Sequence, residues 1–187
     1  MNVWEKAAEQ EEILVPIRIL IEQDGHKYRD DFTWNLNESL LTPEKFAEIL
    51  CFDNKLPAAK FAPIVAESIR TQLNEFIPHV PTTDAEELRI LIKLDLTIGD
   101  ICLIDQFEWD LNNPRNSPEQ FAEIMATELG LSNEFKVRIA HTIREQVTWF
   151  VYQLRLSGQD PSAKEKISNP ELIASYDTPP PNYPWLF

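Results

Sequence analysis

Phe32-Thr33-Trp34-Asn35-Leu36-Asn37 returns about 75 residues later as Phe107-Glu108-Trp109-Asp110-Leu111-Asn112. The segment that follows it returns as well, because Pro43-Glu44-Lys45-Phe46-Ala47-Glu48-Ile49 is matched by Pro118-Glu119-Gln120-Phe121-Ala122-Glu123-Ile124. A period of this length is too long for one unit of a solenoid and suits a small domain present twice in tandem. The sequence therefore predicts two copies of one fold within its 187 residues.

Each copy begins with a predicted β-hairpin. The first strand alternates apolar residues with others, which is the period of two typical of a strand, and Asp24-Gly25 or Gly99-Asp100 then supplies a tight turn. A two-stranded hairpin is not stable alone, so helices must cover one of its faces. The predicted strands are Val15–Ile21 and Lys27–Phe32 in the first copy, and Ile90–Leu96 and Ile101–Phe107 in the second.

Two helices are predicted to follow each hairpin. Thr42-Pro43-Glu44 and Ser117-Pro118-Glu119 place a hydroxyl at the N-cap, proline at the first helical position and an acid in the first turn. This short helix is expected to end near Phe52 or Leu129. A longer helix begins near Pro57 in the first copy and after Ser132 in the second. The expected core stripes are Phe46, Ile49, Leu50, Phe61, Val65, Ile69 and Leu73, and then Phe121, Ile124, Met125, Phe135, Ile139, Ile143 and Val147, with an extension through Phe150, Val151 and Leu154.

The predicted fold is therefore α+β, with two tandem β-β-α-α repeats and an extended Pro-rich C-terminal tail. The expected boundaries are repeat 1 at 13–76, a linker at 77–87, repeat 2 at 88–156 and the tail at 157–187. The aromatic end of the tail either docks onto another surface or frays. Trp34 and Trp109, which follow the predicted hairpins, are expected to lie in the cores.

Composition limits the possible functions. A net charge of −14 argues against direct binding of nucleic acid, which needs a basic surface. No apolar run is long enough to cross a membrane, and the first residues lack the apolar stretch of a signal peptide. Cys51 and Cys102 sit in no C-x-x-C pattern and are expected to be small buried residues of an intracellular protein.

Motifs for chemistry are missing as well. His26, His79 and His141 have no partner at metal-ligand spacing, and no phosphate-binding glycine loop or nucleophile elbow occurs. We therefore expect no catalytic residues, no metal and no cofactor, and a protein that is not an enzyme. Glu44 and Glu48, like Glu119 and Glu123, form like-charged pairs at i and i+4, which indicate either a basic partner or nothing functional.

A polar pair recurs on the two long helices, as Arg70 with Gln72 and Arg144 with Gln146. Two interpretations are open. The side chains either bond within the repeat and tie helix to hairpin, or they face a partner.

Three stretches carry a resemblance to a known family: Leu14-Val15-Pro16-Ile17-Arg18, Asp31-Phe32-Thr33-Trp34-Asn35 and Leu103-Ile104-Asp105-Gln106-Phe107-Glu108-Trp109-Asp110. They resemble the SNF-five family, also called INI-one or SMARCB, a core subunit of SWI/SNF-type chromatin remodellers. The similarity covers about residues 13 to 154. It implies two β-β-α-α repeats, each docking a SWIRM domain of the remodeller's scaffold subunits, in a nuclear protein that supports an ATPase carried on another chain.

The chain departs from the family in two places. Many members have a basic, arginine-rich helix after the repeats that contacts the nucleosome, whereas residues 157–187 contain no arginine. Many also have a long N-terminal region that this chain lacks, which suggests a short paralogue or a piece limited to the repeats.

The expected function is a non-catalytic scaffold subunit of a SWI/SNF-type complex that meets the ATPase and the nucleosome only indirectly. The alternative is an acidic adaptor that binds basic peptides such as histone tails. Candidate partner-binding residues lie at the junction between the helices of repeat 1 and on outward positions of the long helices: Asp53, Leu56, Ile64, Arg70, Gln72, Arg138, Arg144 and Gln146.

Overall fold

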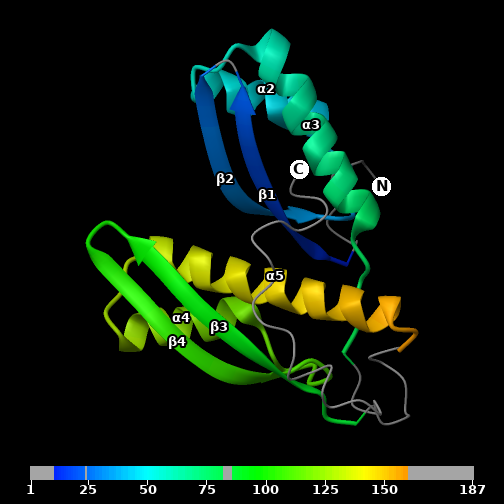
Figure 1. The fold of residues 1–187 in the computed structure, drawn as a ribbon, viewed down its shortest axis with the longest axis vertical. Helices are drawn as coiled ribbons and strands as arrows, with labels where there is room; N and C mark the ends of the chain where they lie inside the picture. The colour runs from blue at the N-terminus through cyan, green and yellow to red at the C-terminus, as the bar shows by residue number, and fades with distance from the viewer. Residues whose placement is uncertain (1–10, 24, 82–85, 160–187) are drawn as a thin grey trace, which may run out of the picture. The chain divides into compact units, whose positions relative to one another are not determined.

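The structure is a computed structural model that describes residues 11–23, 25–81 and 86–159. In these residues the chain folds into two β-hairpins, each followed by two helices (Figure 1). Repeat 1 contains β1 (Leu14–Gln23), β2 (His26–Asn35), α2 (Pro43–Asp53) and α3 (Ala58–Glu75). Repeat 2 contains β3 (Arg89–Ile98), β4 (Ile101–Asp110), α4 (Pro118–Glu128) and α5 (Asn133–Leu156). The predicted α+β fold is confirmed, while the predicted extended tail, from residue 160 onward, lies outside the described residues.

The strands are longer than predicted, at 10 residues each. Each hairpin is antiparallel, and its ladder includes the tryptophan, because Val15 pairs with Trp34 and Ile90 with Trp109. The tryptophans therefore lie in β2 and β4 and not after the hairpins. Both are buried, as expected.

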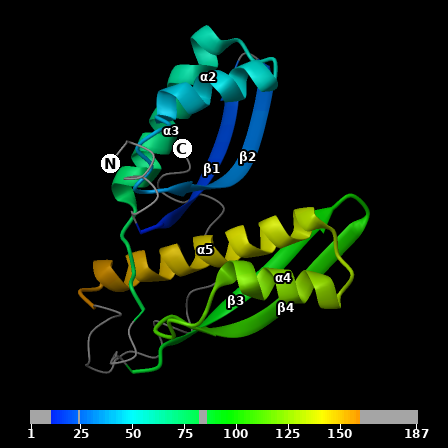
Figure 2. The ribbon, with the colours of Figure 1, turned by 180° about the vertical axis from the view of Figure 1, so that it is seen from behind.

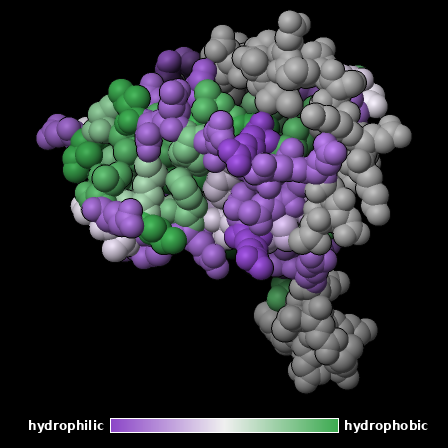
Figure 3. Space-filling view, turned by 90° about the horizontal axis from the view of Figure 1, so that it is seen from below, coloured by the Kyte–Doolittle hydropathy of each residue, from purple (hydrophilic) through white to green (hydrophobic). Residues whose placement is uncertain are grey.

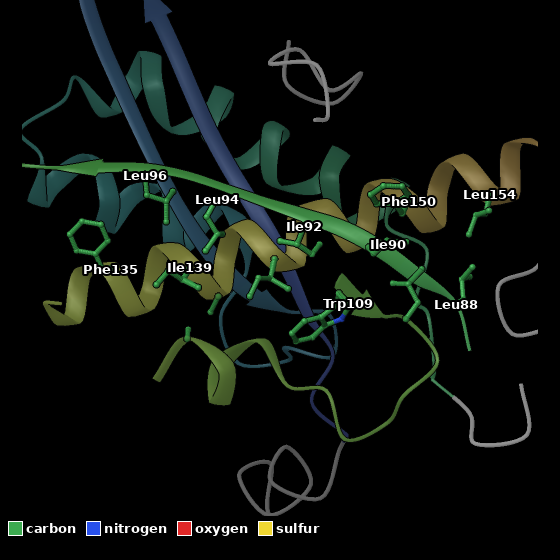
Figure 4. Close-up of a cluster of buried hydrophobic side chains, with 14 residues drawn as sticks. Leu88, Ile90, Ile92, Leu94, Leu96, Trp109, Phe135, Ile139, Phe150 and Leu154 are labelled. Atoms are coloured by element: carbon green, nitrogen blue, oxygen red, sulfur yellow. The ribbon is translucent and has the colours of Figure 1, made fainter. Parts of the chain in front are cut away.

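Each repeat has its own core on one face of its hairpin. The alternate residues of β1 pack against α3, and those of β3 pack against α5. In repeat 2 the long helix α5 lies obliquely across β3 (Figure 1, and from behind in Figure 2). Figure 4 shows this packing in repeat 2, where Ile90, Ile92 and Leu94 meet the side chains of the long helix. In repeat 1 the matching residues are Ile17, Ile19 and Val15, together with Phe61, Val65 and Ile69.

An aromatic cluster joins the short helix to the second strand in both repeats. Phe46 lies 4.8 Å from Phe32 and 5.4 Å from Trp34, measured between ring centroids. In repeat 2 the same separations from Phe121 are 4.4 Å to Phe107 and 5.8 Å to Trp109. Both tryptophans meet their phenylalanine edge-on, at 85°, so equivalent residues have alike environments.

Three residues expected in the cores are exposed. Ile49 and Ile124 are 45% and 59% exposed, because the phase set by the N-caps turns Ala47, Leu50 and Cys51 (in α4, Ala122 and Ala126) toward the core instead. Cys102 is also exposed, since it lies on the outward face of β4. Within the described residues, no helix has the length and apolar character to cross a bilayer.

Candidate partner-binding surface

The recurring tryptophan-containing stretch closes the open end of each hairpin. The Asn35 side-chain oxygen accepts hydrogen bonds from the backbone N–H groups of Ile13 at 3.2 Å and Asn37 at 3.1 Å. Asp110 plays the same part in repeat 2 and accepts from Asn112 at 3.1 Å. The stretch through which the duplication is recognised therefore has a role in the fold of each repeat.

The two recurring glutamines bind the backbone of the first strand. The Gln72 side-chain oxygen accepts from the Arg18 N–H at 2.9 Å, and its amide donates to the Arg18 carbonyl at 2.9 Å. Gln146 makes the same two bonds to Lys93, at 3.0 and 2.7 Å. Both glutamines are buried. Of the two interpretations left open by the sequence, bonding within the repeat is the one that this geometry supports, and we leave both residues out of the candidate surface.

The two recurring arginines tie the long helix to the first turn of the short helix. Arg70 pairs with Glu44, and Arg144 holds the two carboxylate oxygens of Glu119 at 2.6 and 2.7 Å. Burial raises the pKa of the Glu119 carboxyl, but the hydrogen bonds and the charge of Arg144 outweigh burial and hold that pKa below its ordinary value. These pairs are partly exposed, so each contributes less than about 1 kcal/mol to stability.

The remaining acids of the like-charged pairs also have partners in their own repeat. Glu48 lies 3.1 Å from the Lys45 ammonium, and Glu123 lies 2.6 Å from that of Lys136. Basic side chains of the same repeat therefore neutralise part of the negative charge on the short helices.

Exposed apolar side chains occur on several elements, and Figure 3 shows hydrophobic areas on one face of the molecule; one group of them lies on α2. Phe52 is 83% exposed and Ile49, one turn earlier, is 45% exposed. Both project away from the side of α2 that carries Ala47 and Leu50 into the core. Asp53, a predicted site residue, is exposed beside them. We call Ile49, Phe52 and Asp53 the α2 outer face.

The turn after this face contains an unusual backbone conformation. Lys55 has a φ of 54°, the left-handed region that residues with a side chain seldom adopt. The turn is closed by a bond from the Leu56 N–H to the Cys51 carbonyl at 2.8 Å. In repeat 2, Gly130 takes the same place with a φ of 65°. Leu56, another predicted site residue, is half-buried against the repeat 1 core.

The last two predicted residues lie elsewhere. Ile64, which is 37% exposed, precedes Arg70 on α3 by six positions, about 600° of rotation, so it projects from a different side of the helix. Since Arg70 reaches α2, Ile64 does not join the α2 outer face. Arg138 occupies the equivalent position on α5, counted from the matched Phe61 and Phe135.

Repeat 2 reproduces the α2 outer face only in part. Counted from the matched prolines Pro43 and Pro118, the isoleucine and the acid recur as Ile124 and Glu128, whereas Phe52 corresponds to Thr127. Phe52 was not among the residues predicted from the sequence, because the features that the two repeats share do not include it. The difference between Phe52 and Thr127 is the signal that could have identified it. Within the described residues, no group of three or more histidine, cysteine, aspartate or glutamate side chains could hold a metal ion.

Comparison with known proteins gives a consistent result. The family model described as SNF5 / SMARCB1 / INI1 matches residues 7–159. The chain is 37% identical, over 89% of its length, to the SWI/SNF chromatin-remodeling complex subunit snf5 of Schizosaccharomyces pombe, and 39% identical, over 84%, to SNF5 of Saccharomyces cerevisiae. It is 38% identical, over 72%, to the chromatin structure-remodeling complex subunit SFH1 of Eremothecium gossypii. The matches span 32%, 19% and 35% of those relatives, so the chain corresponds to about a third of their length or less.

Proposed function

The chain belongs to the SNF5 / SMARCB1 / INI1 family, and from that premise we propose that it is a non-catalytic subunit of a SWI/SNF-type chromatin-remodelling complex in the nucleus. The names of its relatives, which are subunits of such complexes, support this role. In this proposal the chain is a scaffold that docks SWIRM-domain subunits, and it meets the ATPase and the nucleosome only through the complex.

The observation that carries the docking proposal is the α2 outer face. A phenylalanine that is 83% exposed at the end of a helix has no packing role within its own repeat, and large aromatic side chains are frequent anchors of protein–protein interfaces. The left-handed Lys55 next to it supports the same conclusion, because strained backbone is often kept at functional sites.

The outer edges of the first strands also favour docking through the helices. The glutamine side chains occupy backbone groups of Arg18 and Lys93 at the outer edges of β1 and β3, so a partner strand cannot pair with these two residues while the bonds are made. Two repeats in tandem would then hold two partner domains at a high effective concentration. Because repeat 2 has Thr127 in place of Phe52, we expect the repeats to contribute unequally, with the apolar anchor on repeat 1.

The alternative, an acidic adaptor for basic peptides, draws support from the net charge of −14. The ion pairs of Glu44, Glu48, Glu119 and Glu123 within their own repeats weaken it. A salt titration distinguishes the two proposals, because electrostatic binding of a basic peptide falls steeply with added salt and apolar docking does not.

The test is direct binding of a purified SWIRM-domain scaffold subunit by calorimetry. Phe52→Ser should weaken binding by about 2 kcal/mol, a roughly thirtyfold rise in Kd, which is the effect of losing an interface anchor. Ile104→Ser is the matched control, since Ile104 is 76% exposed but lies on β4, and it should leave the Kd unchanged. If the parent chain does not bind the subunit, SWIRM docking is wrong, and if both variants bind like the parent, the α2 outer face is not the site.

A further inference from the structure

Each of the two sheets has two strands in the described part of the chain, so each of these strands is an edge strand. Half of the backbone N–H and C=O groups of such a strand point away from its partner and can pair with another chain. The bonds from Gln72 to both backbone groups of Arg18 identify which residues these are in β1. Since the pattern alternates, Pro16 and Leu20 face the same open edge.

The glutamine amide imitates a neighbouring strand. It presents one acceptor and one donor to a single residue, which is how a strand pairs with an edge residue, and it does so in both repeats. The second strands are capped in a related way. The Asp105 carboxylate accepts from the N–H of Gln106 at 2.8 Å, and Asp30 does the same for Asp31 at 3.0 Å.

The two first strands differ in how much they depend on their glutamine. In β1, Pro16 precedes the capped residue by two positions and has no N–H to offer, so this edge is interrupted twice. In β3 the equivalent residue is Leu91, which is 41% exposed and has an N–H. The bonds of Gln146 to Lys93 therefore interrupt a β3 edge that, unlike the β1 edge, has no proline at this position.

Without the Gln146 bonds, the backbone groups along the outer edge of β3 could pair with the same edge of a second copy of the chain. In an antiparallel pairing that places Lys93 opposite Asp95 of the other copy, Leu91 falls opposite Thr97, and every one of these residues points its backbone groups outward. The pairing brings opposite charges together twice across the twofold axis, which favours this register.

We propose that Gln146 keeps the chain from pairing with itself, by acting as a built-in substitute for a neighbouring strand at the edge of β3. Gln72 is the same device in repeat 1, where Pro16 duplicates its effect. The recurring glutamine is thus retained in both repeats to close the sheet, and its loss has unequal consequences in the two.

Sedimentation velocity of the full chain tests this over a range of concentrations. Gln146→Met keeps the size of the side chain but removes both bonds, and it should raise the self-association constant at least about tenfold over the parent chain. Gln72→Met removes the equivalent bonds and should sediment like the parent. It is the control for general loss of stability, and circular dichroism checks that both variants are folded at the temperature used.

Two second-site changes identify the edge. Leu91→Pro, which copies Pro16, should return Gln146→Met to the parent's behaviour. Asp95→Lys should do the same, because it places like charges opposite each other in the proposed pairing. If Gln146→Met sediments like the parent, if Gln72→Met associates equally, or if neither second change reverses the association, the proposal is overturned.

Discussion

Replacing Lys55 by glycine should stabilise repeat 1. The φ of 54° places Lys55 in the left-handed region, which costs a residue with a Cβ about 1–2 kcal/mol. Glycine removes that cost but loses more backbone entropy on folding, about 0.5–1 kcal/mol. The closing bond of the turn, from the Leu56 N–H to the Cys51 carbonyl, is unaffected. The net expectation is a gain of about 0.5–1 kcal/mol, or a few degrees in Tm for a domain of this size.

Urea denaturation followed by native-state hydrogen exchange measures this gain, because exchange assigns stability to each repeat separately. Lys55→Ala is the first control. It removes the charge but keeps the Cβ, so it should give little of the gain. Gly130→Lys is the reciprocal change in repeat 2. The space around a Cβ at Gly130 is open, with no atom within 4 Å, so its expected cost of about 0.5–1 kcal/mol is purely conformational. A lower stability of repeat 1 in Lys55→Gly, or an equal gain in Lys55→Ala, would show that the backbone conformation of Lys55 is not the origin of the cost.

Three further predictions concern stability. Thr42→Ala and Ser117→Ala each remove an N-cap bond of 3.3 Å and should cost about 1 kcal/mol by urea denaturation, whereas no change would show that the caps are dispensable. Phe121→Ala should cost about 2–4 kcal/mol, because it empties the site beside Trp109, and a cost below 1 kcal/mol would contradict the cluster's role. Arg144→Met should cost less than about 1 kcal/mol at neutral pH. Since the Glu119 pKa is lowered from 4.5 in the folded state, that difference is present above pH 4.5 and should vanish as the pH falls through the folded pKa. A difference that persists in acid would show that the pair is not its origin.

Much of the fold could be predicted from local signals in the sequence. The helices α2 and α4 begin where a hydroxyl residue, a proline and an acid follow one another, as predicted. Both hairpins turn at the predicted glycine. Each of these signals lies within a few residues of the chain. The strand ends were predicted too short, because the ladder through Trp34 and Trp109 depends on the partner strand and leaves no mark in the local pattern.

The candidate site was less predictable because its residues depend on contacts far apart in the sequence. Gln72 and Arg18 are separated by 54 positions, and nothing in the spacing tells an internal bond from a partner contact. Ile49 follows the apolar periodicity of α2, yet only the packed helix reveals that Leu50 and Ala47 fill the core while Ile49 remains outside. What the repeats share proved to be needed for the fold, so the residues that differ, Phe52 above all, are the better guide to a binding surface.

Docking through the α2 outer face can be tested by comparing the hydrogen exchange of the chain alone with that of the chain bound to a SWIRM-domain scaffold subunit. Binding should slow exchange in the last turn of α2 and in the turn through Lys55, while exchange along the outer edges of β1 and β3 is unchanged. Protection confined to those strand edges, with none on α2, would show that the partner binds elsewhere.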